Sequence, residues 1–236
     1  MSYQLEVAEL AGGYGPLQIL WDINLTVGVG ERVALIGSNG SGKTTLLKTL
    51  VGLNRTWHGR IALDGSPVDQ LRVDQRIRRG MAYLSETGII PSLSVQENLV
   101  IGGYHLTRAQ MARQTERLYT SFPILKERRR SAGGSLSGGQ RKILGLAKAL
   151  MTEPRVLIMD EPSAGLSPLL TNEIIDILGT FHHGHLAYLI AEQNIRFLDL
   201  ADRVYVMESG RIKYSGTVSD LRQNDAVRQA YFGLEA

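Results

Sequence analysis

Short apolar runs alternate along the chain with segments that have the periodicity of helices. Three of these runs, at residues 32–36, 155–159 and 186–191, are apolar at nearly every position. Runs of this kind are typical of strands in a parallel sheet that is covered on both faces. A glycine-rich loop and then a helix, predicted over residues 43–51, follow the first run. The alternation predicts a layered α/β domain.

The middle of the chain differs, because helical signals dominate from about residue 94 to residue 152. Ser94 with Glu97, and Ser137 with Gln140, have the spacing of a capping box. The second box opens a helix predicted over residues 138–151, with one apolar face. We therefore expect a single domain over residues 1–236, with a core lobe at about 1–84 and 153–236 and a helical lobe inserted at about 85–152.

Composition narrows the classes of function. A chain of 236 residues is long enough for one large α/β domain. Its 26 basic and 23 acidic residues leave a formal charge of +3, which is too small to indicate a nucleic-acid partner. Because cysteine is absent, disulfides and thiolate metal sites are excluded. No apolar run approaches the ~18 residues of a membrane span, so a role at a membrane requires spanning helices from a partner.

A phosphate-binding loop is predicted between the first buried strand and its helix. The segment matches the pattern G-x-x-x-x-G-K-[ST], with the strand before it and the helix after it that the pattern requires. Glycines let backbone N–H groups turn towards a phosphate, the lysine can span two phosphates, and the threonine hydroxyl can bind Mg²⁺. The alternative is a glycine-rich turn without a ligand. The predicted nucleotide-binding residues here are Gly37, Ser38, Asn39, Gly40, Ser41, Gly42, Lys43, Thr44 and Thr45.

A pair of carboxylates, Asp160 and Glu161, follows the second buried strand. A carboxylate at the end of such a strand can hold the Mg²⁺ that bridges the phosphates, and its neighbour can activate the attacking water. We expect Asp160 to bind the metal together with Thr44, and Glu161 to act as the general base. The alternative is two acidic residues where a strand meets solvent, but a phosphate loop in the same chain makes that alternative less favourable.

The segment from Leu136 to Gln140 reads LSGGQ. Taken by itself, it could be no more than the capped start of a helix. A phosphate loop, then LSGGQ, then an apolar strand ending in Asp-Glu resembles the ABC ATPase family, and the resemblance covers essentially the whole chain. It implies a P-loop NTPase fold: a RecA-like core with a mainly parallel sheet, an antiparallel β part and an inserted helical lobe.

The resemblance also implies roles for particular residues. The signature residues Ser137, Gly138, Gly139 and Gln140 would close over the ATP that is held by a second ATPase subunit. Tyr14 would stack on adenine, and residues 163–166 would touch the opposite subunit. Two positions depart from the commonest pattern: Glu86 stands where many members have a glutamine that reaches the metal, and Gln193 where most have a histidine that contacts the γ-phosphate. Glutamine cannot carry that positive charge.

Several segments resemble one branch of the family, the ATPase subunits of bacterial uptake systems for branched-chain amino acids and of related importers. They are Glu86, residues 90–99, 161–168, 192–194 and 230–233. This resemblance implies an ATPase that energises uptake of branched-chain amino acids or related small solutes. It implies membrane-spanning permease subunits and a second ATPase subunit as partners, no nucleic acid, and a peripheral place on the cytoplasmic face of the inner membrane.

Two other functions stay open at this point. ABC ATPases without a membrane partner act on DNA or ribosomes, but they generally carry coiled-coil arms, zinc modules or two cassettes, and this chain has one cassette, no heptad arm and no cysteine. A regulatory subunit with impaired hydrolysis is the second alternative. Glu86 and Gln193 favour it, whereas Lys43, Asp160 and Glu161 speak against it.

Overall fold

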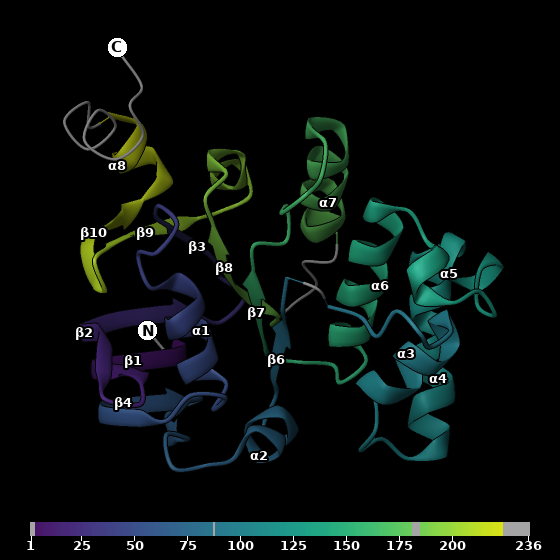
Figure 1. Cartoon of the computed structure of the whole chain (residues 1–236), viewed down its shortest axis with the longest axis horizontal. Coiled ribbons are helices and arrows are strands. Elements are labelled where there is room, and N and C mark those ends of the chain that lie inside the picture. Colours follow the sequence, from purple (N-terminus) through teal and green to yellow (C-terminus); the bar gives the residue numbers. More distant parts are fainter. Residues whose placement is uncertain (1–2, 87, 181–184, 224–236) are drawn as a thin grey trace.

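The computed structural model describes residues 3–86, 88–180 and 185–223, which form two β-sheets and the helices around them (Figure 1). Residues 230–233, used above for the branch resemblance, lie outside these ranges. The larger sheet has the order β10-β9-β3-β8-β7-β6. All its neighbours pair in parallel except β10, which is antiparallel to β9. Its strands are β3 (Arg32–Ile36), β6 (Met81–Leu84), β7 (Val156–Asp160), β8 (Ala187–Glu192), β9 (Arg203–Glu208) and β10 (Arg211–Thr217).

The smaller sheet is antiparallel and has the order β2-β1-β4-β5. Its strands are β1 (Tyr3–Tyr14), β2 (Leu17–Gly28), β4 (Thr56–Leu63) and β5 (Ser66–Pro67). Figure 1 shows this sheet and α1 (Lys43–Leu50) on one side of the molecule, with β7 and β8 beside them. The mainly parallel sheet and the antiparallel part confirm the predicted α/β class.

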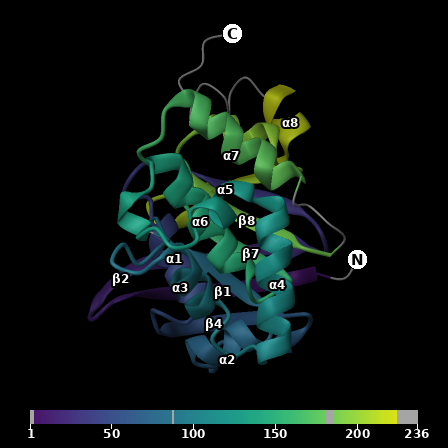
Figure 2. The ribbon, with the colours of Figure 1, turned by 90° about the vertical axis from the view of Figure 1, so that its right-hand side faces the viewer.

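Helices fill the segment between β6 and β7, where the sequence predicts a helical lobe. They are α3 (Val95–Gly102), α4 (Arg108–Ser121), α5 (Pro123–Glu127) and α6 (Gly138–Leu150). Viewed from their side, α3, α4 and α6 lie in front of β7 and β8 (Figure 2). The remaining helices are α2 (Val73–Arg78), α7 (Pro168–Thr180) and α8 (Val218–Gln223), with short 3-10 turns at Gly133–Ser135 and Ile195–Asp199. No helix in the described ranges is both long and apolar enough to cross a membrane.

The large sheet is buried on both faces, as its apolar strands predict. On β7, Val156 and Ile158 pack towards α1 and the antiparallel sheet, whereas Leu157 and Met159 pack towards α6 and α7. Successive side chains of a strand point to opposite faces, which explains the division. The strand β8 divides in the same way, with Leu189 on the α1 side. Each face of the sheet therefore supports a different part of the site.

Some predicted boundaries are wrong by one residue. The strands β7 and β8 each begin and end one residue later than the sequence patterns suggest, because Asp160 and Glu192 are buried and continue the strands. The helices α1 and α6 each end one residue earlier, with Val51 and Met151 as their C-caps. Fraying at element ends produces differences of this size. They matter here because they place two carboxyl groups inside the sheet.

Candidate active site

The phosphate loop runs from the end of β3 into α1. Gly42 is the N-cap of α1 and has φ of 107°, a left-handed conformation that glycine adopts without a Cβ clash. Gly37 approaches the backbone of β9 so closely that a Cβ would lie 2.3 Å from the carbonyl oxygen of Met207. The Lys43 ammonium is buried and donates to the carbonyl oxygens of Gly37 (2.8 Å) and Ser38 (3.1 Å). These contacts fold the loop around the lysine.

The loop fits a phosphate ligand. The N-terminus of α1 has no side-chain cap, so its first backbone N–H groups are available to an anion. The Ser41 hydroxyl is buried without a hydrogen-bond partner. A buried hydroxyl in that state costs free energy unless a ligand satisfies it. The lysine, the helix N-terminus and the unpartnered hydroxyl together suit a polyphosphate.

Asp160 joins the phosphate loop to the neighbouring strand. Its Oδ1 accepts from the Thr44 hydroxyl (3.0 Å), and its Oδ2 accepts from the Tyr83 hydroxyl of β6 (3.0 Å). Burial, and then the charge of Asp160, raise the pKa of Tyr83, so this hydroxyl stays protonated and donates. A buried carboxylate beside a hydroxyl is a set of hard oxygen ligands that suits Mg²⁺. The residues present therefore fit the predicted metal.

Glu161 lies on the phosphate side of this cluster. Its Oε1 is 3.6 Å from the Lys43 ammonium, and its side chain is 30% exposed, so water can reach it. Its φ is 47°, in the left-handed region that few non-glycine residues adopt, and its N–H donates to the Ala191 carbonyl oxygen (2.9 Å). Backbone strain of this kind gathers at functional sites. A solvent-accessible carboxylate beside a lysine can accept a proton from water.

Tyr14 ends β1 close to the start of α1. The residue is 44% exposed, and its hydroxyl lies 3.4 Å from the Thr45 hydroxyl. A hollow of about 580 Å³ adjoins it, lined also by Leu53, Arg55 and Trp57. Burial raises the pKa of Tyr14, but hydrogen bonds from Thr45 and Asn54 outweigh this and lower it overall. The exposed ring is available for stacking, and adenine recognition by Tyr14 stays a prediction.

Glu86 and Gln193 are both exposed and lie in the loops after β6 and β8. The Glu86 backbone carbonyl accepts from the Lys142 ammonium (2.8 Å). Among the described residues, neither the Glu86 carboxyl nor the Gln193 amide hydrogen-bonds to Thr44 or Asp160. A metal role for Glu86 and a phosphate contact for Gln193 therefore stay predictions.

The signature residues start α6, on the sheet face opposite α1. The Ser137 hydroxyl accepts from the Gln140 N–H (3.3 Å), and the Gln140 side chain accepts from the Ser137 N–H (3.1 Å), which completes the predicted capping box. Gly138 lies near Leu166, in the loop before α7, and Gly139 lies against Leu170 in the first turn of α7. In Figure 1 the strand β7 separates α6 from α1. The structure thus does not bring the signature residues to the phosphate loop of the same chain.

Three polar residues near the site had no role in it assigned from the sequence. Tyr83 is bonded to Asp160. Lys142 donates to the carbonyl oxygens of both Glu86 and Glu161 (2.8 and 3.4 Å), and Glu192 is buried at the end of β8. The available signal was weak: Tyr83 stands in the otherwise apolar strand MAYL, and Glu192 ends the strand AYLIAE, which also contains Tyr188. Finding them requires knowing which strands are neighbours.

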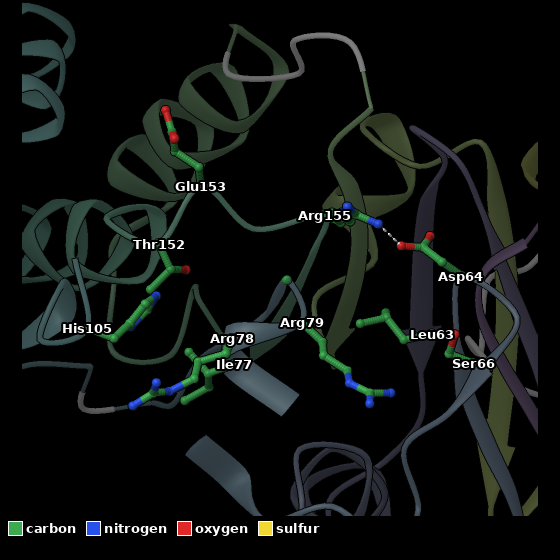
Figure 3. Close-up of a pocket in the computed structure, with 11 residues that line it drawn as sticks. Leu63, Asp64, Ser66, Ile77, Arg78, Arg79, His105, Thr152, Glu153 and Arg155 are labelled. Atoms are coloured by element: carbon green, nitrogen blue, oxygen red, sulfur yellow. Dashed lines mark hydrogen bonds and ion pairs between the residues drawn. The ribbon is translucent and has the colours of Figure 1, made fainter. Parts of the chain in front are cut away.

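A second hollow, of about 430 Å³, lies between α2 and the end of α6 (Figure 3). Its charged groups are largely paired, because Arg155 is bonded to Asp64, and Glu153 forms ion pairs with Arg113 and Arg117. Figure 3 shows the Arg78 and Arg79 side chains pointing apart. Because these cationic groups do not converge on one point, we assign no ligand to this hollow.

The sheet order, the phosphate loop and the buried Asp160 define a P-loop nucleotide-hydrolysing protein. The family model described as ABC transporter matches residues 20–164, and the chain belongs to this family. It is accordingly an ABC transporter ATPase, which binds and hydrolyses ATP. Membership of the ABC transporter family favours a role in transport over the alternative of an ATPase that acts on DNA or ribosomes.

Known relatives cover nearly the whole chain. The high-affinity branched-chain amino acid transport ATP-binding protein BraG of Pseudomonas aeruginosa is 38% identical over 93% of this chain and 95% of its own. The lipopolysaccharide export system ATP-binding protein LptB of Haemophilus influenzae is 34% identical over 97% of each chain. The solved structure of cbiO1 from Clostridium perfringens, part of the ABC transporter complex cbiONQ, has a TM-score of 0.84 at 27% identity, covering 98% of this chain and 94% of that one.

Proposed function

We propose that this chain energises a membrane importer of branched-chain amino acids or related small solutes. The observation that carries its ATPase role is the convergence of Lys43 with Glu161 and of Thr44 with Asp160. The higher identity to BraG than to LptB supports import. Export of lipopolysaccharide is the second candidate, because LptB matches the chain over nearly its full length.

The site residues divide the work of hydrolysis. Residues 37–45 bind the phosphates and Tyr14 the adenine. Glu161 accepts the proton of the attacking water, while the Lys43 ammonium stabilises the negative charge that develops on the phosphate. Gln193 donates its amide to the γ-phosphate. Thr44, Asp160 and Glu86 would hold Mg²⁺, which would neutralise phosphate charge there.

We further propose that the signature residues 137–140 act on a second ATPase subunit. Their position at a helix N-terminus on the face opposite α1 supports this, since they can bind an anion but do not meet their own phosphate loop. Two subunits in head-to-tail contact would complete each other's sites. The helical lobe, about residues 85–152, would pass this closure to membrane-spanning permease subunits at the cytoplasmic face of the inner membrane, with no nucleic acid involved.

The test of the site is steady-state ATPase activity and sedimentation of the Glu161→Gln variant with Mg-ATP. We expect turnover to fall by ~100-fold or more, because a general base contributes that much, and an ATP-dependent dimer to accumulate. Glu153→Gln is the matched control, since Glu153 has nearly the same φ (48°) but lies in the second hollow. Native turnover by Glu161→Gln would remove the base assignment.

The identity of the solute is tested in cells whose only copy of this protein is the Glu161→Gln variant. An importer of branched-chain amino acids predicts loss of labelled leucine uptake, with normal lipopolysaccharide at the cell surface. The reverse result would support the export candidate instead. If both processes are normal, both candidates are wrong, although the ATPase assignment stands.

A further inference from the structure

We infer that Glu192 is a positioning residue that locks the loop after Glu161 to the loop that carries Gln193. The inference rests on the proposed roles of those two residues. Glu192 is the last residue of β8 and is only 2% exposed. A carboxyl buried to that extent is costly unless its oxygens are hydrogen-bonded.

Both oxygens of this carboxyl bind backbone N–H groups from two different loops. Oε1 accepts from the Ser163 N–H (2.8 Å), two residues after Glu161. Oε2 accepts from the Asn194 N–H (3.3 Å), one residue after Gln193. The Asn194 side chain in turn accepts from the Arg196 N–H (3.1 Å) and caps the short helix that follows. One side chain thus fixes the spacing of two loops.

The alternation of side chains along each strand places Glu192 on the opposite face of the sheet from Asp160, the proposed metal ligand. Ile190 packs on the face that α6 and α7 cover, and residues two apart on a strand share a face, so Glu192 points the same way. Asp160 instead points to the α1 face, where it accepts from Thr44. Between them, the Glu161 N–H donates to the Ala191 carbonyl oxygen. Glu192 can therefore position the chain around Glu161 from the α6 and α7 face of the sheet, where it does not compete with Asp160 for Mg²⁺.

The surroundings of Glu192 act on its carboxyl in opposite directions, and its pKa is raised overall. Burial raises its pKa, the hydrogen bonds from Ser163 and Asn194 oppose that rise, and the charge of Glu161 adds to it. Burial lowers the pKa of Lys142 on α6, whereas the charges of Glu86, Glu192 and Glu161 raise it. We call the hydrogen bonds that Glu192 accepts from Ser163 and Asn194 the tether. The tether lies where the phosphate side of the sheet meets the residues expected to contact a second subunit.

Loss of the tether would let the two loops move independently. Glu161 and Gln193 would then keep their side chains but lose their relative placement, and misplacement of about 1 Å can cost ~100-fold in rate. Nucleotide binding should change little, since Lys43 and the phosphate loop make no hydrogen bond to Glu192 among the described residues. If the Glu192 carboxyl contributed only to the stability of the fold, its removal would not lower kcat selectively while leaving KM nearly unchanged.

The experiment measures kcat and KM for Mg-ATP on the purified full-length chain and on three variants of Glu192. Glu192→Gln keeps an oxygen that can accept from Ser163 but turns an amide donor towards the Asn194 N–H, so its kcat should fall by only ~2- to 10-fold. Glu192→Asp keeps the charge but is shorter, and Glu192→Ala removes the acceptor. Both should lose ~10- to 100-fold in kcat, with KM changed less than ~3-fold.

Asp220→Asn is the matched control, because the Asp220 carboxyl also accepts from a backbone N–H, that of Thr217, but lies in α8 away from the site. It should keep the native kcat. The inference is overturned if Glu192→Ala turns over at the native rate, if Glu192→Asp exceeds Glu192→Gln, or if KM rises in step with the loss of kcat. Glu161→Gln in the same assay separates the two proposals. Native turnover there defeats the proposed base, whereas an inactive Glu161→Gln beside a fully active Glu192→Ala defeats only the tether.

Discussion

At the residue scale, Asp160 holds the site together. It is buried, and its two oxygens accept from hydroxyls on different elements, Thr44 of α1 and Tyr83 of β6. A carboxylate in low dielectric needs such partners, since an uncompensated charge there would cost several kcal/mol. The same arrangement positions the Thr44 hydroxyl against the carboxylate with which it is proposed to share a metal. Local hydrogen bonding and proposed ligand binding therefore depend on the same few atoms.

Gly37 carries the first prediction, because no larger residue fits there. In Gly37→Ala the new methyl would lie 2.3 Å from the Met207 carbonyl oxygen and 2.7 Å from the Ser41 hydroxyl. We expect a loss of about 1–3 kcal/mol in the free energy of unfolding, together with weakened ATP binding as the loop shifts. Urea denaturation and titration with a fluorescent ATP analogue measure the two effects.

The matched control is Gly179→Ala in α7. A Cβ at Gly179 would meet its nearest neighbour, Leu200, at 3.8 Å, an ordinary contact. Alanine there should be neutral or stabilise by up to ~1 kcal/mol, because it favours helix more than glycine does. If Gly37→Ala were as stable as this control, the close approach at Gly37 would be incorrect.

At the element scale, the helices between β6 and β7 are each started by a local signal. Capping boxes open α3 at Ser94, α4 at Thr107 and α6 at Ser137, each with its glutamate or glutamine partner three residues later. The boxes satisfy backbone N–H groups that a helix leaves unpaired. Lys142 then ties α6 to the loop after β6 through the Glu86 carbonyl oxygen. Motion of α6 would thereby reach that loop.

The cap at Ser94 gives the second prediction. Ser94→Ala removes the hydroxyl that accepts from the Glu97 N–H and should lower stability by about 1 kcal/mol. In a chain of this length that corresponds to a fall of about 2–4 °C in Tm, measured by circular dichroism.

Thr120→Ala is its control, since the Thr120 hydroxyl donates to the Glu116 carbonyl oxygen inside α4 and caps nothing. That change should be neutral or slightly stabilising, because alanine has the higher helix propensity. Equal losses for the two variants would mean that the Ser94 box contributes no more than an ordinary helix hydroxyl.

At the scale of the whole molecule, the two sheets are joined through Arg203 of β9. Its guanidinium donates to both oxygens of Glu31 (2.7 and 2.8 Å) and to the Thr26 carbonyl oxygen of β2 (2.7 Å). The Glu31 and Arg203 side chains are 21% and 22% exposed. A two-pronged, partly buried pair of this kind fixes orientation as well as distance. It holds the antiparallel sheet, which carries Tyr14, against the sheet that carries Asp160.

Glu31→Gln tests this connection and its dependence on pH. Burial alone would raise the pKa of Glu31, but the hydrogen bonds from Arg203 and Gly28 outweigh it and hold that pKa below its ordinary 4.5. A lowered pKa gives stability that is present above the unfolded value and lost as the pH falls through the folded value. At about pH 7 the variant should be less stable by about 1–3 kcal/mol, and the difference should shrink below about pH 4.5.

Urea denaturation across that pH range gives the measurement. Asp199→Asn is the control, because the Asp199–Arg222 pair is largely exposed (side chains 69% and 60%) and should contribute little. If the difference in free energy of unfolding between Glu31→Gln and the native chain stays constant down to acid pH, the charge of Glu31 does not stabilise the contact between the two sheets.

What the sequence determined by itself is local: the α/β class, the phosphate loop with its strand and helix, the helix caps, and Asp160 and Glu161 at the end of a buried strand. Each of these depends on residues close together in the chain, where spacing fixes geometry. The tertiary structure decided the rest. That Tyr83 meets Asp160, and that Glu192 reaches Ser163, follows from β7 lying between β6 and β8. Strand order is set by packing over the whole chain, and no local pattern of residues encodes which strands become neighbours.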